Sequence, residues 1–274
     1  MKNFIIRALT GIVYAGVMIG MFFIPHYLFL ILLALFTLIG GYEFFKITHH
    51  KFENISTTPF LLFAISLFLA FFFIPKQIIP ITLIILTLTI IISLSIKVFK
   101  VSDNPILETS ISLLPIFWIA IPMGILSFWH LNFDCKTTIL STLILIWLSD
   151  TFAYCGGSLF GKHKMIERIS PKKTWEGFGI SLILTIATAI GISFIPLFND
   201  ANFSTIGSWI GFAIVVNLSG TLGDLVESMV KRNVNVKDSG NFLPGHGGWL
   251  DRFDSILFAI PLGFLYWIAF YLIH

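Results

Sequence analysis

Residues 78 to 98 read IIPITLIILTLTIIISLSIKV, and the first charged side chain in this segment is Lys97. About 20 apolar residues in a helix are enough to cross the hydrocarbon core of a bilayer. Apolar runs of similar length recur along the 274 residues of the chain, of which 57% are hydrophobic and 11% are charged. Soluble domains carry about 25% charged residues. The sequence therefore predicts an integral membrane protein.

The pattern of apolar runs predicts nine membrane spans, of which the third is the shortest. They are residues 5–24, 27–47, 58–74, 78–98, 111–130, 137–155, 178–198, 206–226 and 253–273. Unpaired backbone N–H and C=O groups are not tolerated in lipid, so every span is expected to be helical. The predicted fold class is all-α, a polytopic membrane protein with about nine transmembrane helices. No small-residue cleavage pattern follows the first span, so we interpret it as a membrane helix and not as a signal peptide.

Lysine and arginine side chains favour one side of this arrangement. If the N-terminus is placed in the cytoplasm, only Lys76 and Lys136 of the 17 lysines and arginines lie on the outer side. This bias follows the positive-inside rule, so we expect a cytoplasmic N-terminus. The net charge of +3 then reflects topology, and no basic stripe indicates a nucleic-acid partner. Cys135 and Cys155 are predicted on opposite sides, which argues against a disulfide between them.

Two predicted inner loops, at about 156–177 and 231–250, hold most of the glycine, lysine and polar residues of the second half. A catalytic centre is therefore expected at the inner surface. Gly156 to Lys162 matches most of a Walker-type phosphate loop, but His163 stands where a serine or threonine should bind magnesium. The match also follows a membrane helix and not a strand, so we reject this interpretation. Backbone N–H groups of glycines, together with lysines, still suit a phosphate ligand.

The first inner loop continues as SPKKTWEG, from Ser170 to Gly177. The simplest interpretation of its lysines is a positively charged loop that only sets topology. The grouping of Lys172, Lys173 and Thr174 beside a proline favours a functional role instead. For the lysines earlier in this loop both interpretations stay open.

Polar side chains also occur in two of the predicted spans. Asp150 lies at the inner end of one, and a carboxylate in hydrocarbon costs about 2.5–3.5 kcal/mol, so we expect it to face a polar cavity unless it is hydrated at the interface. In and after the eighth span, polar residues spaced by three and four follow one helix face. These residues are Asn217, Thr221, Asp224, Ser228 and Lys231. Glu227 adds a carboxylate near this face, although an i,i+4 pair with a lysine would explain it equally well.

The second inner loop leads into the last span. It contains Lys237-Asp238-Ser239-Gly240 and then LPGHGG, and the span opens with Asp251-Arg252-Phe253-Asp254. Asp251 and Asp254 are three residues apart and share a helix face. Acids in a first helical turn are also ordinary partners of the helix dipole. The dipole does not explain why a glycine-rich turn, two acids and Asp224 all fall at one membrane surface.

Carboxylates gathered beside many cations are typical of phosphate chemistry. Carboxylates hold Mg²⁺, which usually carries substrate phosphates with it. Two metal ions can stabilise both the attacking and the leaving oxygen of a phosphoryl displacement. Lysine and arginine then neutralise charge on the departing phosphates. The residues alone therefore predict phosphate-group chemistry at the cytoplasmic face, acting on a lipid.

The second loop and its flanks resemble the signature of the phosphatidate cytidylyltransferase family. The matching segments are Ser228–Arg232, Lys237–Gly240, Leu243–Gly248 and Asp251–Asp254, and Gly223-Asp224 and Ser170–Gly177 are also similar to family sequence. The resemblance covers roughly residues 149–256. It implies CTP and phosphatidic acid as substrates, membrane lipids as surroundings, a homodimer, and a divalent cation, Mg²⁺, as cofactor. We expect two such cations, with a monovalent cation as a further candidate.

The same resemblance implies roles for individual residues. Metal ligands are expected at Asp224 and Asp251, with Asp254 and Asp150 as further candidates. Phosphates are expected at Lys231, Arg232 and Lys237, and the nucleotide at Pro171, Lys172, Thr174 and Glu176. The catalytic candidates are Asp224, Lys231, Arg232 and Asp251. The remaining candidates for substrate binding are Asp150, Lys173, Ser228, Asp238, His246 and Arg252.

The implied reaction gives CDP-diacylglycerol and pyrophosphate, and the phosphate of phosphatidic acid needs no strong base because it is already anionic near neutral pH. We expect a single membrane-embedded domain, residues 1–274, with a catalytic half at approximately 137–274 and a less specific hydrophobic half at 1–136. The expected location is a bacterial inner membrane, with the active site facing the cytoplasm. A CTP-dependent lipid kinase remains an alternative. A transporter is disfavoured, because transporters place charges near the bilayer midplane and often in paired repeats.

Overall fold

The computed structural model describes residues 2–99, 103–133, 135–198, 203, 205–240, 242 and 247–273. The chain divides into two compact units. Unit 1 is formed by Met1–Phe128 and Val234–Asp251, and unit 2 by Trp129–Asn233 and Arg252–His274. Each unit is therefore built from two separate pieces of the sequence, and the second inner loop belongs to unit 1.

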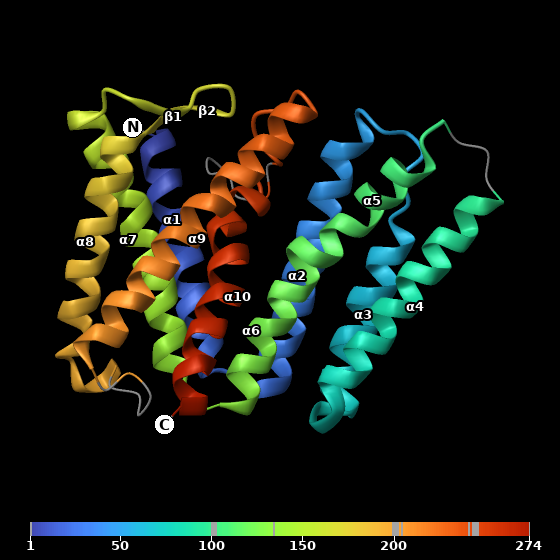
Figure 1. The fold of residues 1–274 in the computed structure, drawn as a ribbon, viewed down its shortest axis with the longest axis horizontal. Helices are drawn as coiled ribbons and strands as arrows, with labels where there is room; N and C mark the ends of the chain where they lie inside the picture. Colours follow the sequence, from blue (N-terminus) through green and yellow to red (C-terminus); the bar gives the residue numbers. More distant parts are fainter. Residues whose placement is uncertain are drawn as a thin grey trace. The chain divides into compact units, whose positions relative to one another are not determined.

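Unit 1 consists of helices joined by short connections (Figure 1). They are α1 (Lys2–Gly20), α2 (His26–His49), α3 (Thr58–Phe73), α4 (Ile78–Val98), α5 (Pro105–Pro115) and most of α6 (Ile121–Asn132), with 3₁₀ turns η1 (Met21–Phe23) and η2 (Pro75–Gln77). A π-helical turn, η3 (Ile116–Ala120), joins α5 to α6 directly after Pro115. A proline inside a helix removes one backbone hydrogen bond, and the π turn accommodates this loss without ending the helix.

The apolar residues of unit 1 divide between its interior and its outer surface. Phe29, Leu33 and Phe44 on α2 are fully buried. Helix α4 instead exposes most of its isoleucine and leucine side chains. Exposed apolar residues at this density are stable only against lipid, so α4 presents its surface to the membrane.

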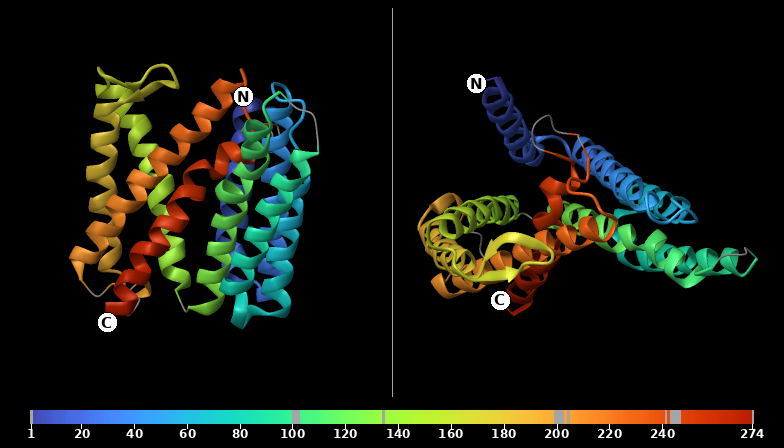
Figure 2. Two further views of the ribbon diagram at one scale, coloured as in Figure 1. Left: turned by 45° about the vertical axis from the view of Figure 1, so that its right-hand side comes forward. Right: turned by 90° about the horizontal axis from the view of Figure 1, so that it is seen from above.

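Unit 2 contains α7 (Lys136–Phe160), β1 (Lys164–Ile166), β2 (Ser170–Thr174), α8 (Trp175–Ser193), η4 (Pro196–Phe198), α9 (Ile206–Asn233) and residues 252–273 of α10 (Leu250–Ile273). The two strands form an antiparallel hairpin that pairs Lys164 with Thr174 and Ile166 with Ser170. Figures 1 and 2 show this hairpin at the end of unit 2 where α7 ends, α8 begins and α9 ends. The polar ends of these helices therefore lie together.

The all-α, polytopic membrane fold is confirmed. Seven helices in the described part of the chain are long and apolar enough to cross a membrane. Two further apolar helices, Leu9–Phe23 and Thr58–Phe73, are shorter, so the expected count of nine spans stays a prediction. The hairpin lies where the sequence predicted an irregular loop, and the span predicted at 111–130 begins earlier, at Pro105.

Candidate functional site

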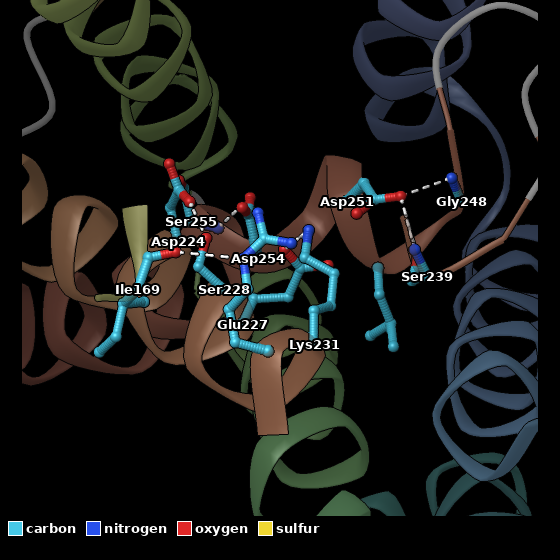
Figure 3. A network of polar contacts seen from close by, with 12 residues as sticks. Ile169, Asp224, Glu227, Ser228, Lys231, Ser239, Gly248, Asp251, Asp254 and Ser255 are labelled. Atoms are coloured by element: carbon cyan, nitrogen blue, oxygen red, sulfur yellow. Dashed lines mark hydrogen bonds and ion pairs between the residues drawn. The ribbon is translucent and has the colours of Figure 1, made fainter. Parts of the chain in front are cut away.

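An acidic cluster occupies the polar end of unit 2. It consists of Asp224, Glu227 and Asp254, each of which contributes one carboxylate oxygen to a group whose members lie within 4.8 Å of one another. Asp224 and Glu227 are three residues apart on α9 and therefore share a helix face, and Asp254 comes from the first turns of α10. Figure 3 shows these side chains converging from the two helices. The sequence predicted Asp224 and Asp254 as metal-ligand candidates, and the structure brings them together.

Gly223 allows α9 and α10 to approach closely enough to form this cluster. A Cβ atom at this position would collide with the backbone carbonyl oxygen of Asp254. Backbone cannot move aside as a flexible side chain can, so any larger residue would push the two helices apart. The residue pair Gly223-Asp224 thus combines a close helix contact with an acid directed at that contact.

Two lysines form ion pairs with two of the three acids in the cluster. The Lys173 ammonium lies 2.7 Å from Asp224 Oδ2 and also donates to the Thr221 carbonyl at 3.4 Å. Lys231 pairs with Glu227 one turn along α9, and both of these side chains are largely buried. Buried charges persist only when they are paired or hydrogen-bonded. The i,i+4 pair that the sequence offered as a structural alternative for Glu227 is therefore present, and the same carboxylate also belongs to the cluster.

Other candidate residues surround the cluster. Ser228 Oγ donates to Asp224 Oδ1 at 3.2 Å. Asp150, at the polar end of α7, interacts electrostatically with Asp224, Lys173 and Arg252. Arg232 donates through Nε to the Ile169 carbonyl in the turn of the hairpin at 3.4 Å. Unit 2 thus gathers acids and bases from α7, the hairpin, α9 and α10 at one end.

The hairpin and the start of α8 hold two candidates for nucleotide binding in fixed positions. Thr174 is the N-cap of α8, and its Oγ1 accepts the N–H of Gly177 at 3.2 Å. Glu176 accepts the backbone N–H groups of Lys162 and His163 at 3.1 Å and contacts the His163 ring at 2.5 Å. Lys172 is exposed on β2. The predicted nucleotide-binding roles of these residues stay predictions, while their contacts order the hairpin.

Asp251 accepts hydrogen bonds from the glycine-rich loop of unit 1. Its Oδ2 accepts the backbone N–H of Ser239 at 3.0 Å, the hydroxyl of Ser239 at 3.1 Å and the N–H of Gly248 at 2.7 Å (Figure 3). Lys237 and Asp238 are exposed in the same loop. His246 lies outside the described residues. The expected role of Asp251 as a metal ligand stays a prediction, and its observed contacts orient the carboxylate within the glycine-rich loop.

Sequence reasoning missed Glu43, which is buried on α2 in unit 1. Its carboxylate accepts hydrogen bonds from Ser239, Trp249 and Leu250. The signal was available, because Glu43 lies inside the predicted span 27–47 and an ionisable residue within a membrane helix indicates a function by default.

The acidic cluster fits a divalent metal ion by the chemistry of its donors. Three carboxylates offer hard oxygen ligands, which suit Mg²⁺. Lys173 and Lys231 at its edge supply positive charge that can hold the remaining oxygens of a phosphate. Together these groups can bind and orient a phosphate ester that carries a metal ion.

Comparisons with known proteins agree with this chemistry. The model of the Cytidylyltransferase family matches residues 5–270. Over 173 residues, or 62% of its length, the chain is 39% identical to a phosphatidate cytidylyltransferase of Staphylococcus aureus strain COL. Over the same share it is 40% identical to one of Staphylococcus haemolyticus. In both cases the match spans 64% of the length of the relative. Since the family model covers nearly the whole sequence, the chain belongs to the cytidylyltransferase family.

Proposed function

We propose that this chain is a phosphatidate cytidylyltransferase, which transfers the cytidylyl group of CTP to phosphatidic acid. The observation that carries the proposal is the acidic cluster of Asp224, Glu227 and Asp254 with Lys173 and Lys231 at its edge. Family membership and the names of the similar staphylococcal proteins support the choice of substrates.

The reaction is a displacement at phosphorus. A phosphate oxygen of phosphatidic acid forms a bond to the α-phosphorus of CTP, the bond from that phosphorus to the β-bridging oxygen breaks, and pyrophosphate leaves with the electron pair. The nucleophile is already an anion, so no side chain must remove a proton. Lys173, Lys231 and Arg252 neutralise the phosphates as negative charge shifts to pyrophosphate. Catalysis then rests on positioning and charge neutralisation.

Asp224, Glu227 and Asp254 would hold a divalent cation, which supplies positive charge to the phosphate oxygens when bound. Mg²⁺ is the proposed ion, and the proposal extends to two divalent cations. Asp251 is proposed as a further ligand. We further propose a homodimer in the inner membrane, with the polar end of unit 2 and the N-terminus on the cytoplasmic side.

The position of the label in CTP tests the proposal against the lipid-kinase alternative. Purified protein is incubated with phosphatidic acid, diacylglycerol as the alcohol acceptor that a kinase needs, Mg²⁺, and CTP labelled either at the α- or at the γ-phosphorus. Cytidylyl transfer places only the α-label in the lipid, whereas a kinase would place only the γ-label there. Asp224→Asn is expected to abolish lipid labelling, and Asp103→Asn, an exposed acid outside the cluster, serves as the matched control. A γ-labelled lipid would overturn the proposal.

A further inference from the structure

Glu43 is a buried carboxylate in unit 1 to which the proposed reaction assigns no task. Only 4% of the residue is exposed. Its Oε1 accepts the N–H of Trp249 at 2.9 Å, and its Oε2 accepts the N–H of Leu250 at 3.0 Å and the hydroxyl of Ser239 at 2.9 Å. Burial of an ionised carboxylate is tolerated only when donors of this kind satisfy it.

The donors place Glu43 at the beginning of α10. Leu250 is the first residue of that helix, and Trp249 precedes it. The first N–H groups of a helix have no partner within the helix and need an external acceptor. A capping acid normally comes from the adjoining residues of the same chain segment. Here it comes from α2, so the contact fixes the start of α10 to a residue more than 200 positions earlier in the sequence.

Two glycines of the loop leave room for this carboxylate. A Cβ atom at Gly240 would lie 2.5 Å from Glu43 Oε1, and one at Gly248 would lie 2.5 Å from Glu43 Oε2. Both distances are shorter than real Cβ contacts. The loop backbone therefore packs directly onto the Glu43 carboxylate. Residues 240 and 248 must lack side chains to leave space for this acid of α2.

Ser239 connects Glu43 with Asp251. Its hydroxyl oxygen lies 2.9 Å from Glu43 Oε2 and 3.1 Å from Asp251 Oδ2. A hydroxyl has one proton, so it donates to one of these carboxylates at a time. The backbone N–H of Ser239 donates to Asp251 independently of that choice.

We propose that Glu43 is a positioning residue, which orients the Asp251 carboxylate through Ser239 and through the start of α10. The functional importance of this role rests on the proposed cytidylyltransferase reaction and on the predicted participation of Asp251 in metal binding. The less specific N-terminal half of the sequence thereby contributes a residue on which the reaction depends.

The test uses the whole protein in detergent and the variant Glu43→Gln, which keeps the size of the side chain but removes its charge and one acceptor. Mn²⁺ affinity is measured by electron paramagnetic resonance, and kcat and KM for CTP are measured with phosphatidic acid. Loss of a residue that orients a metal ligand costs about 10- to 100-fold in affinity or activity. We expect a decrease of that size in Mn²⁺ affinity and in kcat, with little change in KM for CTP.

Hydrogen exchange of the Trp249 and Leu250 amides provides a readout of the contact itself. Loss of a hydrogen bond to a charged acceptor is expected to accelerate their exchange by about tenfold or more. Ser239→Ala removes only the hydroxyl between the carboxylates, so it is expected to fold and to weaken Mn²⁺ binding in the same direction. Thr37→Val, a buried change on the same helix whose hydroxyl donates to the Leu33 carbonyl of that helix, is the matched control.

Wild-type Mn²⁺ affinity in both Glu43→Gln and Ser239→Ala would overturn the proposal, even if amide exchange were faster, because Glu43 would then only cap a helix. If Glu43→Gln does not fold, Ser239→Ala decides alone. A wild-type protein that binds Mn²⁺ but forms no CDP-lipid would contradict the proposed function, while the Mn²⁺ affinities of the variants would still decide the role of Glu43.

Discussion

Lys173 extends from the hairpin and contacts the acidic cluster. This contact joins the first inner loop to the polar face of α9, which were predicted separately from the sequence. Its ammonium is 2.7 Å from Asp224, and its side chain is 23% exposed. At that exposure solvent weakens the attraction, so the pair contributes little to stability. We expect the Lys173 ammonium to act mainly by binding a substrate phosphate beside Asp224.

We predict that Lys173→Gln lowers kcat/KM for CTP by about tenfold or more, because one charged hydrogen-bond donor to phosphate is lost. The unfolding temperature should change little. Lys164→Gln, an exposed lysine on the neighbouring strand, should have a smaller effect. Steady-state kinetics on the two variants measure the difference, and equal losses would contradict a specific role for Lys173.

Glu227 is the cluster residue for which the sequence left two interpretations open. We predict that Glu227→Gln raises the Mg²⁺ concentration for half-maximal activity by at least about tenfold, because one of the three carboxylates loses its charge. Glu167→Gln, an exposed acid in the turn of the hairpin, is the control and should match the wild type. An unchanged Mg²⁺ titration would show that Glu227 serves only as the partner of Lys231.

At the scale of elements, α7 and α8 meet through glycine residues that leave no room for a side chain between their backbones. A Cβ atom at Gly177 would lie 2.7 Å from the Ala153 carbonyl oxygen and 2.9 Å from the Gly157 nitrogen. Small residues are the usual means by which membrane helices approach closely. The same contact holds the hairpin above the polar end of unit 2.

Two glycines of α8 provide a matched test of this packing. Gly177→Ala is predicted to lower stability by about 1–3 kcal/mol, because backbone on α7 cannot yield to the added methyl group. Gly179→Ala meets nothing within 4 Å and should be neutral or slightly stabilising, since alanine favours helix more than glycine does. Thermal unfolding in detergent measures both variants, and equal effects would argue against a close contact.

The helices were predicted from the length of the apolar runs. This prediction succeeded for segments such as residues 78–98 because lipid excludes other backbone structures. The segment 78–98 is α4 with the same bounds. Hydropathy could not predict the hairpin, because the pairing of strands outside the membrane depends on local turn geometry. The sequence also could not predict the contacts of Glu43, since these join residues 196 to 207 positions apart.

For the candidate site, spacing along one helix was informative and assembly between helices was not. The sequence placed Asp224 on the polar face of one helix and Asp254 at the opening of the next. The contribution of Gly223 became visible only when the backbone of α10 was placed beside it. Tertiary contacts of this kind have no one-dimensional pattern.

At the scale of the whole molecule, one open question in the topology is whether the short helix α3 crosses the membrane. We predict that it does, which places Asn54 inside and Lys76 outside. Both side chains are exposed. In a Cys155→Ser background, a membrane-impermeant maleimide added to intact cells should label Lys76→Cys and not Asn54→Cys. Labelling of both or of neither would contradict nine alternating spans.

The contacts of Glu43 also bear on how the protein is made. Its hydrogen-bond donors lie 196 to 207 residues later in the chain. At about 5–20 residues per second, a ribosome needs roughly 10–40 s to supply them after α2 has been synthesised. During that interval α2 must reside in the translocation machinery or the bilayer with an acid that lacks its final donors. Synthesis of the last quarter of the polypeptide therefore supplies the hydrogen bonds that stabilise a buried carboxylate in α2, one of the first membrane helices to be made.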